Sequence, residues 1–329
     1  MKLLFKVITL AAIVSAIFSS CAPITDNVMK RYEKENFLYL IAGFDDTAEN
    51  TDVLFTLGYD KISNSIKIAQ IPRDTYADFG ASQNKINQFY ATAIYAGASK
   101  VSAMEKTVRF IGSLFGAEFD GYIGLGTSAF RHIVDALGGV EISVSEDMLI
   151  EIDGEAPLKL KSGVNLVDGS DAEKFIRYRK GYVMGDLARI DAQKLFLSAL
   201  LSKLSQELTL PTLMKIAGIL QNEAITDIKL ASFSSIIMNA IKGGTVADYV
   251  TVPGEPTISK SGLSFYVLNR KTAAETAKRY MFAKNEFDPD RKFLNENEYS
   301  FVNIYEDTDF SIREYGDASL PKIQTKRSN

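Results

Sequence analysis

Short apolar runs near the start of the chain alternate with turn residues, a pattern that predicts β-strands. Residues 37–42, 52–59 and 65–71 are almost continuously apolar and are separated by Asp, Lys, Ser and Asn. A strand that is apolar on both faces is typically covered on both faces, so we expect these segments to be central strands of a sheet. Residues 121–125 and 140–144 predict two further strands.

Helical spacing takes over after the third predicted strand. Residues 99–115 place apolar side chains three and four positions apart, and Gly116 follows as a helix-ending residue. Residues 128–137 predict a second helix, which Gly138 and Gly139 would end. Strands that alternate with helices in this way predict an α/β sandwich.

The second half of the chain adds longer helices and a change of pattern. Ser170-Asp171-Ala172-Glu173 has the form of a capping box, so we expect a helix to begin at about Asp171. A longer helix is expected over residues 187–208, and Pro211 suits the first turn of another. Two strand-like segments and one helix follow, at residues 246–252, 263–268 and 271–282. These strands either join the main sheet or form a small C-terminal α/β extension.

The N-terminus has the layout of an export signal. A short basic start precedes an apolar run over residues 7–18 and two small residues. Cys21 is the only cysteine in 329 residues, which excludes an internal disulfide and a thiolate metal cluster. Phe18-Ser19-Ser20-Cys21 resembles a bacterial lipobox, so we expect lipidation at Cys21. Plain secretion and a signal anchor are the alternatives, and in each case most of the chain lies outside the cytoplasm.

Charge and composition narrow the range of partners. The net charge is -4, and loss of Lys2 and Lys6 with the signal makes it -6, with acidic and basic residues interspersed. Nucleic acid is excluded as a partner because binding to it requires a net basic surface. The hydrophobic content of 46% is sufficient for a globular core.

Two aspartates stand at the expected ends of neighbouring strands. Asp45 follows the first strand and Asp52 begins the second, so a hairpin would bring both carboxylates to one edge of the sheet. Carboxylates are the hard oxygen ligands that Mg²⁺ prefers. The alternative is that both are ordinary loop residues, a common position for Asp.

Arginines recur at the same kind of position. Arg73 and Asp74 follow the third strand directly after a proline, and Arg189 and Gln193 share one helix face. Arg177 and Arg179 point the same way only if the preceding helix ends near residue 176 and the chain is then extended. A guanidinium fork matches phosphate oxygens, so the set indicates phosphoryl chemistry. Surface salt bridges are the alternative for each arginine alone.

These residues lie in motifs that resemble the LytR-CpsA-Psr family, whose extracytoplasmic members transfer glycopolymers from polyprenyl-pyrophosphate carriers onto peptidoglycan. The resemblance covers about residues 37–204 and implies a central mixed β-sheet sandwiched by helices, with an apolar groove for the polyprenyl chain. Its motifs are Leu40-Ile41-Ala42-Gly43-Phe44-Asp45, Thr51-Asp52, Ile71-Pro72-Arg73-Asp74-Thr75, Lys85-Ile86-Asn87, Val134-Asp135-Ala136-Leu137-Gly138-Gly139-Val140, Asp168-Gly169-Ser170-Asp171-Ala172, Arg177-Tyr178-Arg179 and Gly185-Asp186-Leu187-Ala188-Arg189 through Gln193.

The same resemblance suggests how the chain is divided. We expect a signal peptide, a tether, a LytR-CpsA-Psr-like catalytic domain, a C-terminal extension packed on it and a polar tail, at residues 1–20, 21–36, 37–208, 209–290 and 291–329.

The resemblance also implies roles for individual residues. Asp45 and Asp52 would bind Mg²⁺, and Asp74 is the candidate base for the acceptor hydroxyl, or else a partner that orients Arg73. The pyrophosphate would be held by Arg73, Lys85, Asn87, Arg177, Arg179, Arg189 and Gln193. We expect the sole histidine, His132, to be structural.

Two positions depart from the family pattern. Asn50 and Ala192 stand where the family commonly has arginine. The loss of these two cations is expected to reduce activity or to alter the ligand. The expected function is Mg²⁺-dependent transfer of a glycosyl phosphate from a polyprenyl-pyrophosphate carrier to a cell-wall glycan hydroxyl, by a membrane-anchored envelope protein. The alternatives are hydrolysis of the same carrier, and a non-catalytic envelope lipoprotein that binds polyprenyl phosphates.

Overall fold

The computed structural model describes residues 34–44, 50–80, 84–152, 154–178, 186–207, 209–228, 246–259 and 262–284. The chain divides into two units, and the second, Asn36–Asn329, contains all the helices and strands that are described. The predicted signal peptide, Cys21 and the polar tail lie outside the described residues. Within the described part of the chain, no helix combines the length and the apolar character needed to cross a membrane.

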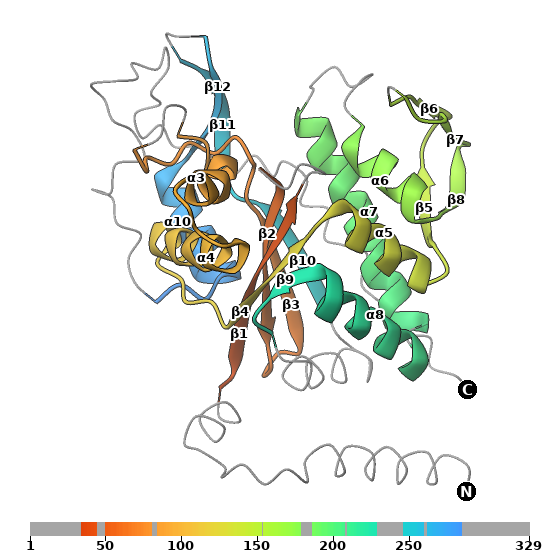
Figure 1. Cartoon of the computed structure of the whole chain (residues 1–329), viewed down its shortest axis with the longest axis horizontal. Coiled ribbons are helices and arrows are strands. Elements are labelled where there is room, and N and C mark those ends of the chain that lie inside the picture. The colour runs from red at the N-terminus through yellow and green to blue at the C-terminus, as the bar shows by residue number, and fades with distance from the viewer. Residues whose placement is uncertain are drawn as a thin grey trace, which may run out of the picture. The chain divides into compact units, whose positions relative to one another are not determined.

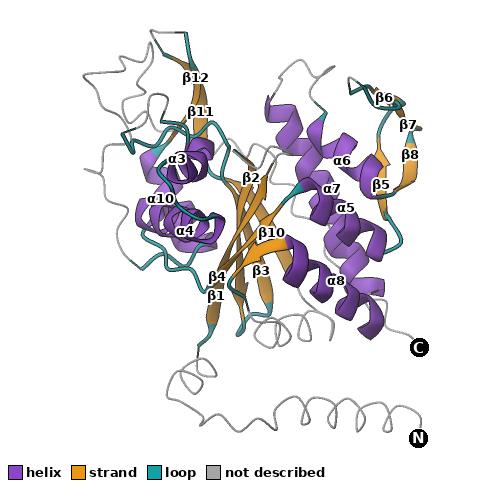
Figure 2. Ribbon diagram, viewed as in Figure 1, coloured by secondary structure: helices purple, strands orange, loops and turns teal. Residues whose placement is uncertain are grey.

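A mixed β-sheet forms the centre of this unit (Figures 1 and 2). Its strands lie in the order β10-β3-β2-β1-β4-β9. The middle strand β1 runs antiparallel to β2 and parallel to β4, which confirms the expected mixed sheet. The bounds are β1 Asn36–Phe44, β2 Thr51–Asp60, β3 Ser65–Gln70, β4 Gly121–Leu125, β9 Ala224–Thr226 and β10 Val246–Thr251.

The remaining described strands form three small antiparallel pairs. They are β5 Val140–Val144 with β8 Gly163–Val167, β6 Met148–Ile150 with β7 Leu158–Leu160, and β11 Gly254–Ile258 with β12 Ser264–Leu268. The C-terminal strands were expected either to join the main sheet or to form a separate extension, and each alternative holds for one of them. β10 joins the main sheet parallel to β3, whereas β12 pairs with β11 in a separate hairpin. The division of the chain at residue 208 stays a prediction.

The helices agree closely with the apolar periodicity. Helix α4 begins after Ser99, whose side chain accepts a hydrogen bond from the Ser102 N–H, and ends at Gly116 in the left-handed region, with φ of 64°. The described helices are η1 Ile86–Gln88, α3 Phe89–Tyr95, α4 Lys100–Phe115, α5 Thr127–Ala136, α6 Gly169–Arg177, α7 Asp186–Glu207, α8 Leu210–Glu223 and α10 Arg270–Tyr280.

The capping box expected at Ser170 is wrong. The helix begins at Gly169, and its N-cap is Asp168, whose carboxylate accepts a hydrogen bond from the Asp171 N–H at 2.9 Å. Strand β8 ends at Val167, so Asp168 is the first residue free to take the extended capping conformation before the helix. Glu173 is thereby released from a capping role, and its side chain turns inward.

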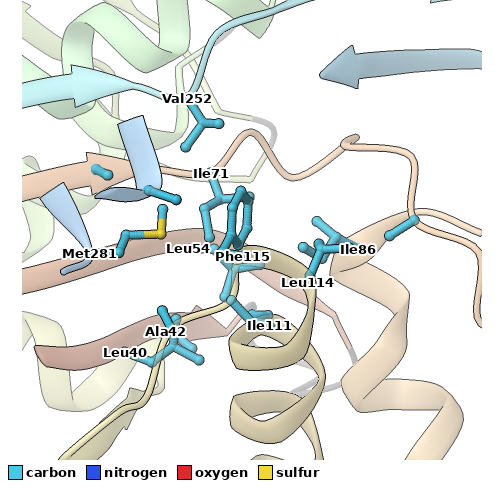
Figure 3. Packing of buried hydrophobic residues seen from close by; sticks show 14 of the residues in the cluster. Leu40, Ala42, Leu54, Ile71, Ile86, Ile111, Leu114, Phe115, Val252 and Met281 are labelled. Atoms are coloured by element: carbon cyan, nitrogen blue, oxygen red, sulfur yellow. The ribbon is translucent and has the colours of Figure 1, made fainter. Parts of the chain in front are cut away.

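Two apolar layers cover the two faces of the sheet. On β1, Leu40 and Ala42 face a layer that includes Ile111 and Phe115 of α4 (Figure 3). Residues of α3 and α10 belong to the same layer, while Tyr39 and Ile41 face residues of α7 and α8. This alternation follows from the period of two in a strand. Both faces are buried, which explains why the central strands are apolar at nearly every position.

A third apolar cluster links α5, α6 and α7 with two of the small strand pairs, β5–β8 and β6–β7. It includes Val134 of α5, Phe175 of α6 and Phe196 of α7, together with Ile142 of β5. The start of α6 packs tightly against α5. The Gly169 N–H donates to the carboxylate of Asp135 at 2.8 Å.

Replacement of Gly169 by alanine is predicted to destabilise this helix contact. A Cβ at Gly169 would lie 2.8 Å from the carbonyl carbon and the Cα of Arg131. These are backbone atoms, so relief of the clash requires one helix to shift against the other. We expect the free energy of unfolding in urea to fall by about 1–3 kcal/mol.

Gly218→Ala in α8 is the matched control, because a Cβ there meets nothing within 4 Å. Alanine has the higher helix propensity, so this variant should be more stable by about 0.5–1 kcal/mol. Equal stability changes in the two variants would contradict the packing argument.

Candidate functional site

The register of the central strands brings the predicted site residues together. Phe55 pairs with Gln70, and the antiparallel ladder continues as Ile71 N–H donates to the Leu54 carbonyl at 2.9 Å. Counted two residues further, beyond the paired part of the strands, the same register places Asp52 level with Arg73. The Arg73 Nη1 lies 2.6 Å from the Asp52 Oδ1, with side-chain exposures of 20% and 32%.

A second ion pair lies in the loop that follows β3. Lys85 Nζ is 3.0 Å from Asp74 Oδ1, and both side chains are mostly buried, at 17% and 21% exposed. Main-chain bonds hold the two motif segments side by side, because Ile86 N–H donates to the Thr75 carbonyl at 2.8 Å. Two adjacent residues, Arg73 and Asp74, are therefore each held in an ion pair, Arg73 by Asp52 and Asp74 by Lys85.

Asn87 is fixed by its main chain in the same cluster. Its N–H donates to the Arg73 carbonyl at 3.2 Å, and its own carbonyl accepts from Thr51 Oγ1 at 3.3 Å. The residue is only 7% exposed, and its side-chain Oδ1 has no hydrogen-bond partner among the described residues. A buried polar atom of this kind is rare in native proteins and fits a place where a ligand or ion binds.

Only one of the two residues predicted to bind metal is described. Asp45 lies outside the described residues, although the pairing of Phe44 with Thr51 confirms that β1 ends beside the start of β2. Asp52 offers carboxylate oxygens, which are the donors Mg²⁺ prefers. Among the described residues no group of three or more His, Cys, Asp or Glu side chains is arranged to hold a metal. Asp52 therefore fits as one protein ligand of an ion that keeps phosphate and water oxygens.

Arg177 is the last residue of α6, one position beyond the predicted end of this helix. The helix ends at this residue, and Tyr178 is extended, with φ of -62° and ψ of 130°. Arg177 Nη1 donates to Glu173, and Arg131 Nε on α5 donates to the other oxygen of the same carboxylate. Arg179 lies outside the described residues. Sequence reasoning missed Arg131 and Glu173, which are 42 positions apart and form no local motif.

Gln193 reaches the end of β3 from α7. Its Oε1 accepts a hydrogen bond from Gln70 Nε2 at 2.6 Å, and the Tyr249 hydroxyl donates to Gln70 Oε1. Gln70 and Tyr249 are both buried, at 5% and 4% exposed. Gln193 is therefore tied to a residue three positions before Arg73. Arg189 belongs to the same helix, but its side chain lies outside the described part of the structure.

The two departures from the family pattern have different settings. Ala192 is 5% exposed and belongs to the apolar cluster of α5, α6 and α7, so an arginine there would place a charge among apolar side chains as they stand. Asn50 is half-buried in the bend before β2. His132 on α5 contacts Glu223 on α8, with 2.8 Å between Nδ1 and Oε2.

The fold and the charged cluster together define an α/β sandwich with paired cations and carboxylates where β2 begins and β3 ends. Comparison with known families agrees, since the LytR_cpsA_psr family model matches residues 16–281. The chain therefore belongs to the LytR_cpsA_psr family, and the resemblance found in the sequence is confirmed.

Several characterised proteins are similar to this chain. The polyisoprenyl-teichoic acid–peptidoglycan teichoic acid transferase TagV of Bacillus subtilis is 24% identical over 78% of this chain and 67% of its own length. TagU of Oceanobacillus iheyensis, which carries the same transferase name, is 26% identical over 63% of each chain. The cell wall biosynthesis protein LcpA of Corynebacterium glutamicum is 26% identical over 67% of this chain, which spans 46% of LcpA.

Solved structures show the same fold. The crystal structure of B. subtilis TagV has a TM-score of 0.63 and 22% identity, over 77% of this chain and 99% of that one. TagT bound to LIIa-WTA has a TM-score of 0.60 and 20% identity, over 76% and 91% of the two chains. These similarities confirm the predicted α/β architecture with a mixed central sheet.

Gln70→Leu is predicted to weaken the attachment of α7 to the sheet. Leucine removes both the donor to Gln193 and the acceptor for the Tyr249 hydroxyl. Two polar groups then lose a partner, so the free energy of unfolding should fall by about 1–3 kcal/mol.

Tyr249→Phe is the partial control, because it removes only the hydroxyl and leaves the bond between Gln70 and Gln193. Urea unfolding of both variants checks the prediction. A Gln70→Leu protein as stable as the wild type would show that the polar chain contributes nothing.

Proposed function

We propose that this protein is an extracytoplasmic, Mg²⁺-dependent glycopolymer transferase. It takes a glycosyl phosphate from a polyprenyl-pyrophosphate carrier and delivers it to a hydroxyl of a cell-wall glycan. The observation that carries this proposal is the arrangement of Arg73 with Asp52 and Lys85 with Asp74, which sets two cations at one end of the sheet in a member of this family. The transferase names of TagV and TagU support the substrate class.

The proposed reaction breaks the phosphoanhydride bond of the carrier and forms a phosphodiester bond to the glycan. The acceptor hydroxyl oxygen forms a bond to the phosphorus that carries the sugar, and the bond from that phosphorus to the bridging oxygen breaks. Polyprenyl phosphate leaves with the electron pair, and the hydroxyl proton passes to a base, for which Asp74 is the candidate. The result is a glycan phosphodiester and a free lipid phosphate.

The residues at the site act mainly by position and charge. Charge builds on the phosphoryl oxygens in the transition state, so fixed cations supply most of the stabilisation. Asp52 holds the Arg73 guanidinium in place at 2.6 Å, which leaves less ordering to be done when phosphate binds. When bound with Asp45 and Asp52 as its protein ligands, Mg²⁺ would supply Lewis-acid charge stabilisation and align the diphosphate.

The proposed location of the protein is the membrane surface outside the cytoplasm. Lipidation at Cys21 would hold the protein at the extracytoplasmic face of the membrane, where polyprenyl carriers present their head groups. Arg177, Arg179, Arg189 and Gln193 complete the proposed diphosphate site from α6, α7 and the segment between them. The same cations would serve hydrolysis, with water in place of the glycan hydroxyl, and a carrier that only binds would use them without turnover.

Arg73→Ala is predicted to abolish transfer. The assay combines the purified protein, a polyprenyl-pyrophosphoryl sugar, an acceptor glycan and Mg²⁺, and it separates linked glycan, free phosphate and unchanged lipid. Loss of a cation that contacts the transition state should lower the rate on the order of 10²–10³-fold. Arg73→Lys keeps the charge without the fork and should recover only part of the rate.

Arg109→Ala is the matched control, since Arg109 is an exposed arginine on α4, with its side chain 70% exposed. It should transfer at the wild-type rate. Linked product formed at full rate by Arg73→Ala would refute the site, and free phosphate in place of linked product would favour hydrolysis.

Asp52→Asn is predicted to raise the Mg²⁺ requirement. The amide loses the negative charge but keeps the size, so the Mg²⁺ concentration for half-maximal transfer should rise on the order of tenfold. A chelator should stop the wild-type reaction, and added Mg²⁺ should restore it. Asp147→Asn, at an exposed aspartate paired with Lys161, is the control and should need the same Mg²⁺ concentration for half-maximal transfer as the wild type. Transfer unaffected by the chelator would refute the proposed metal.

A further inference from the structure

A single buried carboxylate joins helices α5 and α6 through Arg131 and Arg177. Glu173 on α6 has a side chain only 3% exposed, and its two oxygens accept hydrogen bonds from different arginines. Arg131 Nε on α5 donates to Oε2, and Arg177 Nη1 donates to Oε1. The side chains of Arg131 and Arg177 are 38% and 45% exposed. The carboxylate is therefore buried beneath two cations that reach the surface.

This arrangement differs from an ordinary helical salt bridge. Glu105 and Arg109 on α4 have the same spacing of four residues, but they are 48% and 70% exposed and their charged atoms are 3.9 Å apart. Such surface pairs contribute little and fix neither side chain. A buried carboxylate, in contrast, must be paired and hydrogen-bonded to stay charged. Glu173 thus constrains Arg177 far more strongly than a surface glutamate would.

The helix that carries Glu173 is itself held firmly. Asp168 caps its start with a bond of 2.9 Å to the Asp171 N–H, and Asp135 on α5 accepts from the Gly169 N–H at 2.8 Å. Phe175 on the same helix is 2% exposed in the apolar cluster shared with α5 and α7. The position of the Glu173 carboxylate is therefore set by the packing of α5 against α6.

We propose that Glu173 is a positioning residue for Arg177, with Arg131 as the second cation that pairs with the buried carboxylate. This inference rests on the proposed function, in which Arg177 contacts the diphosphate of the lipid carrier. Glu173 holds the guanidinium at the end of α6 in the orientation that meets phosphate oxygens, so less side-chain freedom is lost on binding. It acts through Arg177 and does not contact the ligand.

The test is a double-mutant cycle between Glu173 and Arg177, with inorganic pyrophosphate as the probe. Titration calorimetry on the wild type, Glu173→Gln, Arg177→Ala and the double variant gives four affinities. Each single variant should bind pyrophosphate about tenfold more weakly, the effect of one charge-assisted hydrogen bond. The double variant should bind no more weakly than Arg177→Ala alone, because Glu173 then has no arginine to orient.

Kinetics provide a second readout on the same four proteins. In the transfer assay, Glu173→Gln should lower kcat/KM on the order of 10²-fold in the wild-type background, since small misplacement of a site residue costs this much. It should have no further effect in the Arg177→Ala background. Glu105→Gln is the matched control, because it breaks a pair of the same spacing at the surface and should leave both readouts unchanged.

Glu173→Asp tests the inference even if Glu173→Gln does not fold. It keeps the charge and shortens the reach by one methylene, so it should fold and should bind pyrophosphate between the wild type and Glu173→Gln. If the Glu173 and Arg177 effects multiply, or if Arg177→Ala binds pyrophosphate as well as the wild type, the inference is overturned. Failure of the proposed function has a different signature, namely a wild type without transfer, or transfer that survives Arg73→Ala.

Discussion

The antiparallel pairing of β2 with β3 is the constraint on which the site depends. The ladder pairs residues as far as Phe55 with Gln70, and the Ile71 N–H still bonds to the Leu54 carbonyl. Asp52 and Arg73, 21 positions apart, therefore lie close enough for an ion pair just beyond the end of β3. A slip of one residue would turn every side chain of the strand to the opposite face and separate the pair. Buried apolar residues on both faces of the strand prevent such a slip, because either layer would lose its contacts.

The end of β3 also connects the two layers of helices to one another. Gln70 faces α7 and β10, where it bonds with Gln193 and Tyr249. Three residues later, Arg73 meets Asp52 and bonds through its carbonyl to the N–H of Asn87. The described part of the site therefore receives residues from both sides of the sheet and from the loop that follows β3. Its geometry follows from the same packing that stabilises the core.

Each described cation of the predicted set is held by a carboxylate. Asp52 holds Arg73, Asp74 holds Lys85 and Glu173 holds Arg177. This pairing explains how an acidic chain, with a net charge of -4, can present cations in a fixed place. A group that is oriented before its ligand arrives spends less of the binding energy on ordering, which is the general advantage of a preorganised site.

Local pattern determined the long elements and the motif residues of this protein. Residues 99–115 were predictable because their apolar positions repeat the helical period, and residues 65–71 because they are almost continuously apolar. Three-residue strands such as β6 and β7 are too short to show either pattern. The capping motif at Ser170 misled because a better-placed cap, Asp168, precedes it. Glu173 with Arg131, and Gln70 with Tyr249, became visible only in the folded chain. Their contacts join positions 42 and 179 residues apart, and such distances are set by how helices and strands pack, which no local spacing records.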